Sequence, residues 1–476
     1  MTPKPRPRGS KRRNMSKSAQ IQLSDHFDYG KLLKFVMPSI GMMIFTSIYG
    51  VVDGFFVSNF AGDVAFAAVN LIMPFIMIFS ALGFMVGTGG TALVSMKLGE
   101  GKEREAKEIF SLLVYVVCIV GVLVTIVGTI MAEDVAVLLG ATEEMLPYCV
   151  LYARITLLSA CPFMLQNLFQ SFLVVAEKPR IGFYLTVAAG VTNMVLDGVL
   201  VGILDLQVTG AAIATVMAEC VGGFVPLIYF ILPNSSRLRL TGTRFYGKAL
   251  LKTCTNGSSE FLTNISMSFV NMLYNKQLLK FAGSKGVAAY GVIMYVCFIF
   301  IAIFIGYSIG TAPIVGYNYG AGKTEELKNI FSKSLRLIGI FAILMLGLAM
   351  LLANPLAKLY VGYDEELMSM TVTAFRIYSI SFLIMGFNVY GSSFFTALNN
   401  GAVSAAISFM RTLVFPILMV YILPLIFGIN GIWLAATCVE LLSLIVTGTL
   451  IIKMRDRYGY WPKALPENQP INPDQQ

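Results

Sequence analysis

The sequence predicts an all-α membrane protein with twelve transmembrane helices, arranged as two six-helix lobes related by a pseudo-twofold axis. Three observations lead to this fold class: an apolar composition, twelve apolar runs of membrane-spanning length, and an internal repeat. The 476 residues are 57% hydrophobic and only 13% charged, whereas a soluble protein has roughly 45–50% apolar and about 25% charged residues. This difference indicates a polytopic membrane protein.

Twelve apolar runs are long enough to cross a bilayer, which takes about 20 residues of helix. Lipid cannot satisfy free backbone groups, so only helices or closed barrels span it, and runs this long and continuous indicate helices. The approximate limits are 33–58, 65–96, 109–131, 149–176, 181–204, 208–232, 253–282, 287–319, 329–353, 368–398, 402–427 and 430–453. Several exceed thirty residues, so we expect tilts, kinks or extensions beyond the membrane.

Charged residues predict the orientation, because cytoplasmic connections carry an excess of Lys and Arg. In a twelve-span topology one side carries Lys11, Arg12, Arg13, Lys17, Lys97, Lys102, Arg104, Lys107, Arg237, Arg239, Arg244, Lys248, Lys453, Arg455 and Arg457. The opposite side carries Glu133, Asp134, Glu143, Glu144, Asp364, Glu365 and Glu366. We therefore expect a multi-pass protein of the inner (cytoplasmic) cell membrane with both termini in the cytoplasm. The net charge of +9 then belongs to loops facing the cytoplasm and does not indicate nucleic-acid binding.

An internal repeat divides the chain into two halves. The stretch LGEGKEREAKEIFS from Leu98 matches YGAGKTEELKNIFS from Tyr319 without a gap, so that Gly99 corresponds to Gly320, 221 residues later. The same offset relates FAG at 60–62 to FAG at 281–283, and Gly210 to Gly431. Each half has six spans, an even number, so both halves enter the membrane from the same side. The repeat is therefore parallel, as in many transporters with a central site. The predicted units are a tail 1–30, an N-lobe 31–232, a linker 233–252, a C-lobe 253–455 and a tail 456–476.

Several classes of function are excluded by the motifs. The stretch GYNYGAGKT, Gly316 to Thr324, resembles a phosphate-binding loop, but that motif needs glycine at the position of Tyr317. The only histidine is His26, which excludes a His-ligated metal or a His-based triad, and none of the seven cysteines forms a C-x-x-C pair. We therefore expect no enzymatic activity, no cofactor, no nucleotide and no nucleic acid.

Polar residues in the first half indicate an oxygen-rich site. Asp53 lies in the first apolar run, and Asn193 and Asp197 share one face of the fifth run because they are four residues apart. Ala211 and Thr215 have the same spacing near the start of the sixth run. Two carboxylates, an amide and a hydroxyl at similar depth suit a hard cation such as Na⁺, or a shared proton. The alternative is that each residue makes a separate packing or capping contact.

The second half carries a polar seventh run and three further charges. Glu260, Asn264, Asn271 and Asn275 recur at helical spacing, which predicts either a cavity wall for a cationic substrate or a proton, or hydrogen bonds between helices. Glu219 and Glu440 occupy equivalent positions in the two repeats. A symmetric structural role explains them at least as well as a role in transport. Arg411 lies inside the eleventh run and needs an acidic partner or a wet cavity.

Taken together, residues 30 to about 455 resemble the multidrug and toxic compound extrusion (MATE) transporters of bacterial type. The resemblance rests on the double repeat, MPSIG at Met37, YGVVDGFFV around Asp53, NMVLD ending at Asp197, GAAIAT ending at Thr215, and the paired G-x-GK turns. It implies two lobes around a V-shaped cavity, and export of amphipathic organic cations in antiport with Na⁺ or H⁺ by alternating access.

The resemblance also implies an ion site made by Asp53, Asn193, Asp197 and Thr215, with the Ala211 carbonyl as an additional ligand. Two departures are Gly198, where many relatives have proline, and the sequence NGSSE, which lacks a common proline but carries Glu260. Some subgroups use that glutamate for coupling, so which lobe binds the ion stays open.

The alternatives are a flippase for lipid-linked sugars from the same superfamily, an integral membrane enzyme, and a major facilitator transporter. A flippase tends to have a cationic cavity, whereas this chain has more intramembrane acids than bases. A catalytic constellation and the loop signatures of major facilitators are not visible in the sequence. We therefore expect a monomeric ion-coupled exporter of small amphipathic cations.

Overall fold

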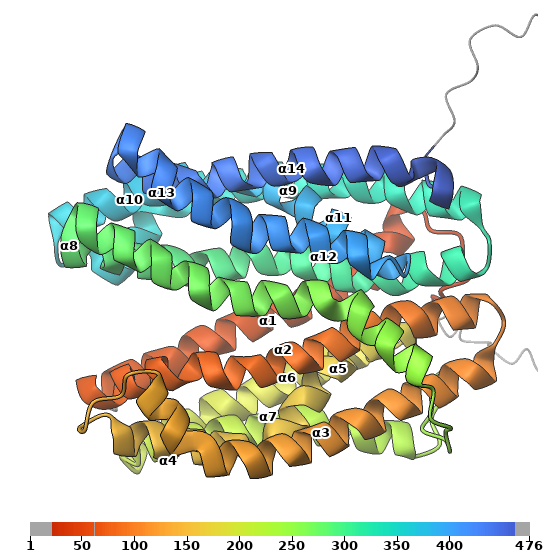
Figure 1. Cartoon of the computed structure of the whole chain (residues 1–476), viewed down its shortest axis with the longest axis horizontal. Helices are drawn as coiled ribbons and strands as arrows, with labels where there is room; N and C mark the ends of the chain where they lie inside the picture. The colour runs from red at the N-terminus through yellow and green to blue at the C-terminus, as the bar shows by residue number, and fades with distance from the viewer. Residues whose placement is uncertain (1–20, 61, 462–476) are drawn as a thin grey trace, which may run out of the picture.

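The computed structural model describes residues 21–60 and 62–461, except for the side chains of Ser58, Asn59 and Asp63. The predicted tail residues Lys11, Arg12, Arg13 and Lys17 and the residues after 461 lie outside this part of the chain. Figure 1 shows two bundles of roughly parallel helices, one made by the first half of the chain and one by the second. The two predicted lobes are therefore confirmed.

The helices of each lobe follow the predicted runs. The N-lobe contains α1 Tyr29–Phe60, α2 Asp63–Gly99, α3 Glu103–Leu138, α4 Leu146–Leu157, α5 Ala160–Val175, α6 Pro179–Leu196, the π-helix η1 Asp197–Ile203, and α7 Gln207–Ile231. The C-lobe contains α8 Gly247–Gly320, α9 Thr324–Val361, α10 Glu365–Ser379, α11 Phe382–Ala397, α12 Gly401–Phe409, the π-helix η2 Met410–Val414, α13 Phe415–Phe427 and α14 Ile429–Tyr458.

Twelve spans emerge once the breaks in these helices are taken into account. Within the described residues, nine helices are long and apolar enough to cross a membrane, and two bent pairs add two more spans. The bent pairs are α4 with α5, at 57°, and α10 with α11, at 48°. Helix α8 counts twice, because Gly283 has non-helical dihedrals (φ 60, ψ −155) that separate the seventh span from the eighth.

The structure repeats the irregularities of the first lobe in the second. Gly62 and Gly283 both have positive φ, and so do Gly101 and Gly322 in the turns after α2 and α8. A bent pair and a π-helix also occur once in each lobe. The sequence duplication is therefore a duplication of backbone geometry as well.

The two lobes meet most closely where α2 packs against α8. A Cβ atom on Gly89 would collide with the carbonyl oxygen of Thr253, and one on Gly257 would collide with that of Met85. Gly99 and Gly320 make the same kind of backbone approach nearer the α2–α3 and α8–α9 turns. Glycine at these positions lets two helical backbones touch. The lobes are thus closed against each other toward that end of the molecule.

The connections that the sequence predicts to be basic and those it predicts to be acidic lie at opposite ends of the molecule (Figure 1). The α2–α3 turn, the α5–α6 turn, the interlobe linker and the α8–α9 turn lie together at the right-hand end in Figure 1, which we call the basic end. The other end carries the α3–α4 and α9–α10 connections, where Lys285 pairs with Asp364 and Glu366 at 2.8 Å and 2.6 Å. That the basic end faces the cytoplasm remains a prediction from the positive-inside rule.

Candidate functional site

The predicted oxygen-rich site forms in the N-lobe, where α1, α6, η1 and α7 converge. The Asp53 carboxyl of α1 lies within interaction distance of Asn193, Asp197 and Thr215. Asn193 and Asp197 are 2% and 0% exposed. Asp197 is the first residue of η1, and a π-turn of this kind widens a helix locally and often occurs at functional sites. The structure therefore brings together the four side chains that the sequence places on three different spans.

Five oxygen atoms of this cluster are buried and have no hydrogen-bond partner among the described residues. They are Asp53 Oδ1, Asn193 Oδ1, both carboxylate oxygens of Asp197, and Thr215 Oγ1. No lysine or arginine of the described chain pairs with either aspartate. Buried polar atoms normally have a partner, and an unpaired one is costly. Five unpartnered oxygens around two carboxylates fit a hard cation or a proton as the missing partner.

Two neighbours extend this cluster toward the middle of the lobe. Ala211 is 1% exposed and lies one helical turn before Thr215 on α7. Glu219, one turn after Thr215, accepts a hydrogen bond from the hydroxyl of Ser159, which lies at the break between α4 and α5. The carboxyl of Glu219 also interacts electrostatically with that of Asp53, so Glu219 belongs to the N-lobe cluster.

Sequence reasoning missed Tyr152 of α4 in the same place. Its ring is 1% exposed, and its hydroxyl faces Thr215 within the field of Asp53, Asp197 and Glu219. Nothing in the sequence distinguishes this tyrosine from the aromatic residues that fill the apolar runs around it. A phenol at this position can donate a hydrogen bond to a ligand or to a carboxylate of the cluster.

The C-lobe contains a different arrangement, in which the charges neutralise each other. Arg411, in η2, binds Glu440 of α14 in a bidentate manner, with Nε and Nη2 each 2.9 Å from Oε1. The amide of Asn388 on α11 also donates to Glu440, at 2.7 Å. Glu440 is 4% exposed. Arg411 thus has an acidic partner, which was one of the two roles that the sequence left open.

The residues of the predicted polar stripe on the seventh span make separate contacts. The amide of Asn264 donates to the backbone carbonyl of Glu260, at 2.8 Å, and Asn271 accepts from the hydroxyl of Tyr290, at 2.9 Å. Asn275 is exposed. Of these four residues, only Glu260 interacts electrostatically with the Arg411–Glu440 pair, through the positive charge of Arg411.

Comparison with known proteins identifies the family. The model of the MatE family matches residues 38–199 and again residues 261–422, which is one match for each lobe and more than half of the chain. The chain belongs to the MatE family. It is therefore a multi-pass membrane transporter rather than an enzyme.

Relatives of this MatE protein cover nearly all of its length. The multidrug export protein MepA of Staphylococcus saprophyticus is 24% identical over 429 residues, covering 90% of this chain and 94% of its own. The MepA protein of Staphylococcus aureus is 22% identical over the same share of both chains.

Solved structures share the fold. One described as the outward-facing conformation of a multidrug resistance MATE family transporter has a TM-score of 0.86 and 22% identity, covering 93% of this chain and 99% of that one. A transporter of the MOP superfamily from Pyrococcus furiosus, described as having a binding pocket of reversed polarity, has a TM-score of 0.83 and 22% identity, covering 90% and 97%.

The two MatE units of this chain differ at the oxygen-rich site. By the 221-residue offset, Tyr274 and Ala436 stand in the C-lobe where Asp53 and Thr215 stand in the N-lobe. Helix α13, which follows η2, has the sequence FPILMVYILPLIF and contains no acidic residue. The duplication therefore carries an unsatisfied acid cluster in one lobe and a neutralised ion pair in the other.

Proposed function

We propose that this protein is a secondary active transporter that exports small amphipathic organic cations in exchange for Na⁺ or H⁺. The observation that carries this proposal is the group of five unpartnered oxygen atoms around Asp53 and Asp197. The named function of the MepA relatives as multidrug export proteins supports the substrate class. The excess of buried acids over bases supports cationic cargo.

The acid cluster provides a means of coupling. Two carboxylates in a medium of low dielectric repel each other, so the empty site favours a separated arrangement of α1, η1 and α7. A bound Na⁺ or a proton removes the repulsion and draws these elements together. Because α1 also packs against α8, a shift of α1 changes the contact between the lobes. Ion binding and substrate release are thereby linked through one helix.

The second candidate, a flippase for lipid-linked sugars, has less support. Such a protein needs buried cations that are free to bind an anionic headgroup. Arg411 is 16% exposed and is held by both carboxylate oxygens of Glu440, so its charge is already matched. The polarity of the described interior favours the exporter.

The proposal is tested in proteoliposomes that contain the purified protein and a fluorescent amphipathic cation such as ethidium. Cation movement is measured under an imposed Na⁺ gradient and, separately, under an imposed pH gradient. We expect one of the two gradients to drive transport by the wild type and not by Asp197→Asn. Glu133→Gln removes an exposed acid of the same lobe and is expected to behave like the wild type.

Two outcomes would reject parts of the proposal. Wild-type protein that moves the cation under neither gradient is not an antiporter of this kind. If Asp197→Asn retains gradient-driven transport while Glu260→Gln loses it, coupling belongs to the C-lobe and not to the oxygen-rich site.

A further inference from the structure

The residues that precede α1 form a strap across the basic end of the molecule. The strap comprises residues 21–28, which have no helical structure. Leu23 and Phe27 within it are both 0% exposed. Their side chains pack into a hydrophobic cluster that is formed mainly by α8 to α14. A segment that leads into the first helix of the N-lobe is therefore part of a hydrophobic cluster to which the C-lobe contributes most residues.

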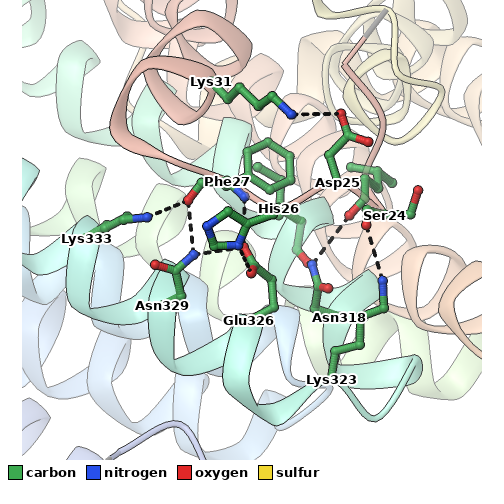
Figure 2. Close-up of polar contacts among 12 residues, drawn as sticks. Ser24, Asp25, His26, Phe27, Lys31, Asn318, Lys323, Glu326, Asn329 and Lys333 are labelled. Atoms are coloured by element: carbon green, nitrogen blue, oxygen red, sulfur yellow. Dashed lines mark hydrogen bonds and ion pairs between the residues drawn. The ribbon is translucent and has the colours of Figure 1, made fainter.

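The C-lobe binds the strap through the α8–α9 turn and the start of α9, as Figure 2 shows. Glu326 accepts from the Phe27 amide at 2.9 Å and contacts Nδ1 of His26 at 2.6 Å. The carbonyl of Phe27 accepts from Asn329, at 3.0 Å, and from Lys333, at 2.7 Å. Two further strap carbonyls, those of Leu23 and Ser24, accept from Asn318 and Lys323 at 3.4 Å and 3.2 Å.

The N-lobe holds the same strap from the other side. The amide of Leu23 donates to Oε1 of Glu177 at 2.9 Å. Glu177 lies in the α5–α6 turn, is 7% exposed, and also pairs with Arg237 of the linker at 3.5 Å. The backbone of Leu23 thus donates a hydrogen bond to the N-lobe through its N–H and accepts one from the C-lobe through its C=O.

Among residues 21–60 and 62–461, no comparable strap lies on the corresponding turn of the first repeat. Glu105 is the mate of Glu326, 221 residues earlier, and its carboxylate pairs with Lys97 of its own lobe at 3.2 Å. The covalent linker packs nearby instead, with Tyr246 donating to Glu108. That linker must cross between the lobes in any conformation, whereas covalent connectivity does not require the strap to contact the C-lobe.

We propose that the strap is an interlobe latch that holds the basic ends of the two lobes together and must release before they can separate. The inference rests on alternating access as part of the proposed function. Separation of the lobes at this end would break the Leu23 contacts to one lobe or the other and would expose Leu23 and Phe27 to water. Each of these changes is unfavourable. The latch therefore favours the arrangement in which the basic ends are closed.

The carboxylate of Glu326 is the central contact of this latch, so Glu326→Ala is the direct test. Two measurements on the full-length protein report separate steps. Because His26 is the only histidine, its NMR signal in tag-free, histidine-labelled protein reports whether the strap is docked. Hydrogen–deuterium exchange of α2 residues 85–99 and α8 residues 306–320 reports whether the closely packed helices of the two lobes separate.

We expect Glu326→Ala to shift the His26 signal and to raise exchange in both helix segments roughly tenfold, equivalent to about 1.4 kcal/mol. The matched control is Glu105→Ala, which removes the mate of Glu326 and is expected to change neither readout. Neither measurement depends on transport, so the latch can fail while the exporter proposal stands, and the reverse also holds.

The latch is rejected if Glu326→Ala shifts the His26 signal without raising exchange between the lobes, or if Glu105→Ala raises that exchange equally. Should Glu326→Ala not yield folded protein, Asn329→Ala removes one donor to the Phe27 carbonyl and is judged by the same two criteria. A smaller increase in the same segments is then expected, and its absence overturns the proposal.

Discussion

At the scale of single residues, the two lobes differ in how their buried charges are satisfied. In the N-lobe, both carboxylate oxygens of Asp197 lack a partner. In the C-lobe, Glu440 receives hydrogen bonds from both Arg411 and Asn388. An unsatisfied charge is retained in a membrane protein at a cost in stability, so it indicates ligand binding, whereas a satisfied pair indicates structure.

The Arg411–Glu440 pair is predicted to be structural, and a double-mutant cycle tests this. Either Arg411→Met or Glu440→Gln leaves its partner unmatched in the lobe, which costs roughly 3–5 kcal/mol for a fully buried pair. The double variant removes both charges and is expected to lose less stability than the two single variants combined. Thermal unfolding in detergent measures the difference.

Glu219→Gln is the matched control for this cycle, because Glu219 is the repeat mate of Glu440 and its hydrogen-bond partner is the neutral Ser159. We expect a clearly smaller loss of stability than for Glu440→Gln. Equal losses at the two sites, or strictly additive effects of Arg411→Met and Glu440→Gln, would argue against a structural ion pair.

The strap is predicted to loosen at low pH. Burial by itself would raise the pKa of Glu326, but the Phe27 amide, His26 and Asn329 outweigh it and hold the pKa below its usual range. A carboxyl whose pKa is lowered by folding stabilises the docked state above its unfolded pKa and loses that effect as the pH falls through its folded pKa. The contribution of Glu326 is therefore complete at pH 7 and is lost in acid, as the pH falls through the lowered pKa of this carboxyl.

The His26 NMR signal of the wild type measures this dependence against that of Glu326→Gln. We expect Glu326 to contribute fully to strap docking near neutral pH and to lose that contribution in acid, as the pH falls through its lowered pKa. The Gln variant has no carboxyl at this position, so it is expected to lack that acid transition. An identical acid transition in both proteins would contradict the role of Glu326.

The sequence predicts the members of the N-lobe cluster better than their surroundings. Asn193 and Asp197 are recognisable because polar residues four apart in an apolar helix share a face. The partner of Arg411 was not predictable, because Glu440 is 29 residues away on another helix and only packing brings them together. Tyr152 is one of 21 tyrosines, and its role depends wholly on three-dimensional position.

At the scale of helices, apolar length predicts the spans but not their breaks. The run at 149–176 was expected as one helix, yet it bends by 57° near Leu158. Pro162, in the first turn of α5, cannot donate a backbone hydrogen bond to the carbonyl of Leu158, which favours a break there. Ser159 at the break also reaches Glu219. The π-helix η2 is likewise followed by a proline, Pro416, in the first turn of α13. The π-helix η1 has no such signal, and its position depends on contacts between helices that the hydrophobic pattern of the sequence does not reveal.

The close packing of α2 against α8 gives a prediction at this scale. Gly257→Ala places a methyl group against the Met85 carbonyl, and two helix backbones must move apart to accommodate it. We expect a loss of roughly 1–3 kcal/mol and faster hydrogen exchange at the α2–α8 contact. Differential scanning fluorimetry and exchange measure the two effects.

Gly291→Ala is the control, because Gly291 lies in the second span of α8, beyond Gly283, and a Cβ atom there would meet nothing within 4 Å. This change is expected to be neutral or to stabilise the protein by up to about 1 kcal/mol through helix propensity. If both substitutions destabilise the protein equally, the effect arises from α8 itself and not from the contact between the lobes.

At the scale of the whole molecule, the duplication predicts the fold, and departures from it coincide with the proposed ion site and the proposed latch. The offset of 221 residues, seen at Gly99 and Gly320, establishes two lobes before any helix is placed. Asp53 and Glu326 have mates, Tyr274 and Glu105, that differ in residue type or in contact. Asp53 belongs to the oxygen-rich site, and Glu326 contacts the strap.

The most direct test of ion exchange through the N-lobe measures the ion rather than the substrate. Proteoliposomes loaded with an amphipathic cation are diluted into substrate-free buffer, and inward movement of radioactive Na⁺ or of protons is followed. The account predicts that the outward substrate gradient drives ion uptake by the wild type, and that Asp53→Asn and Asp197→Asn abolish it. Ion uptake by Asp197→Asn at the wild-type rate, or none by the wild type for either ion, would contradict the account.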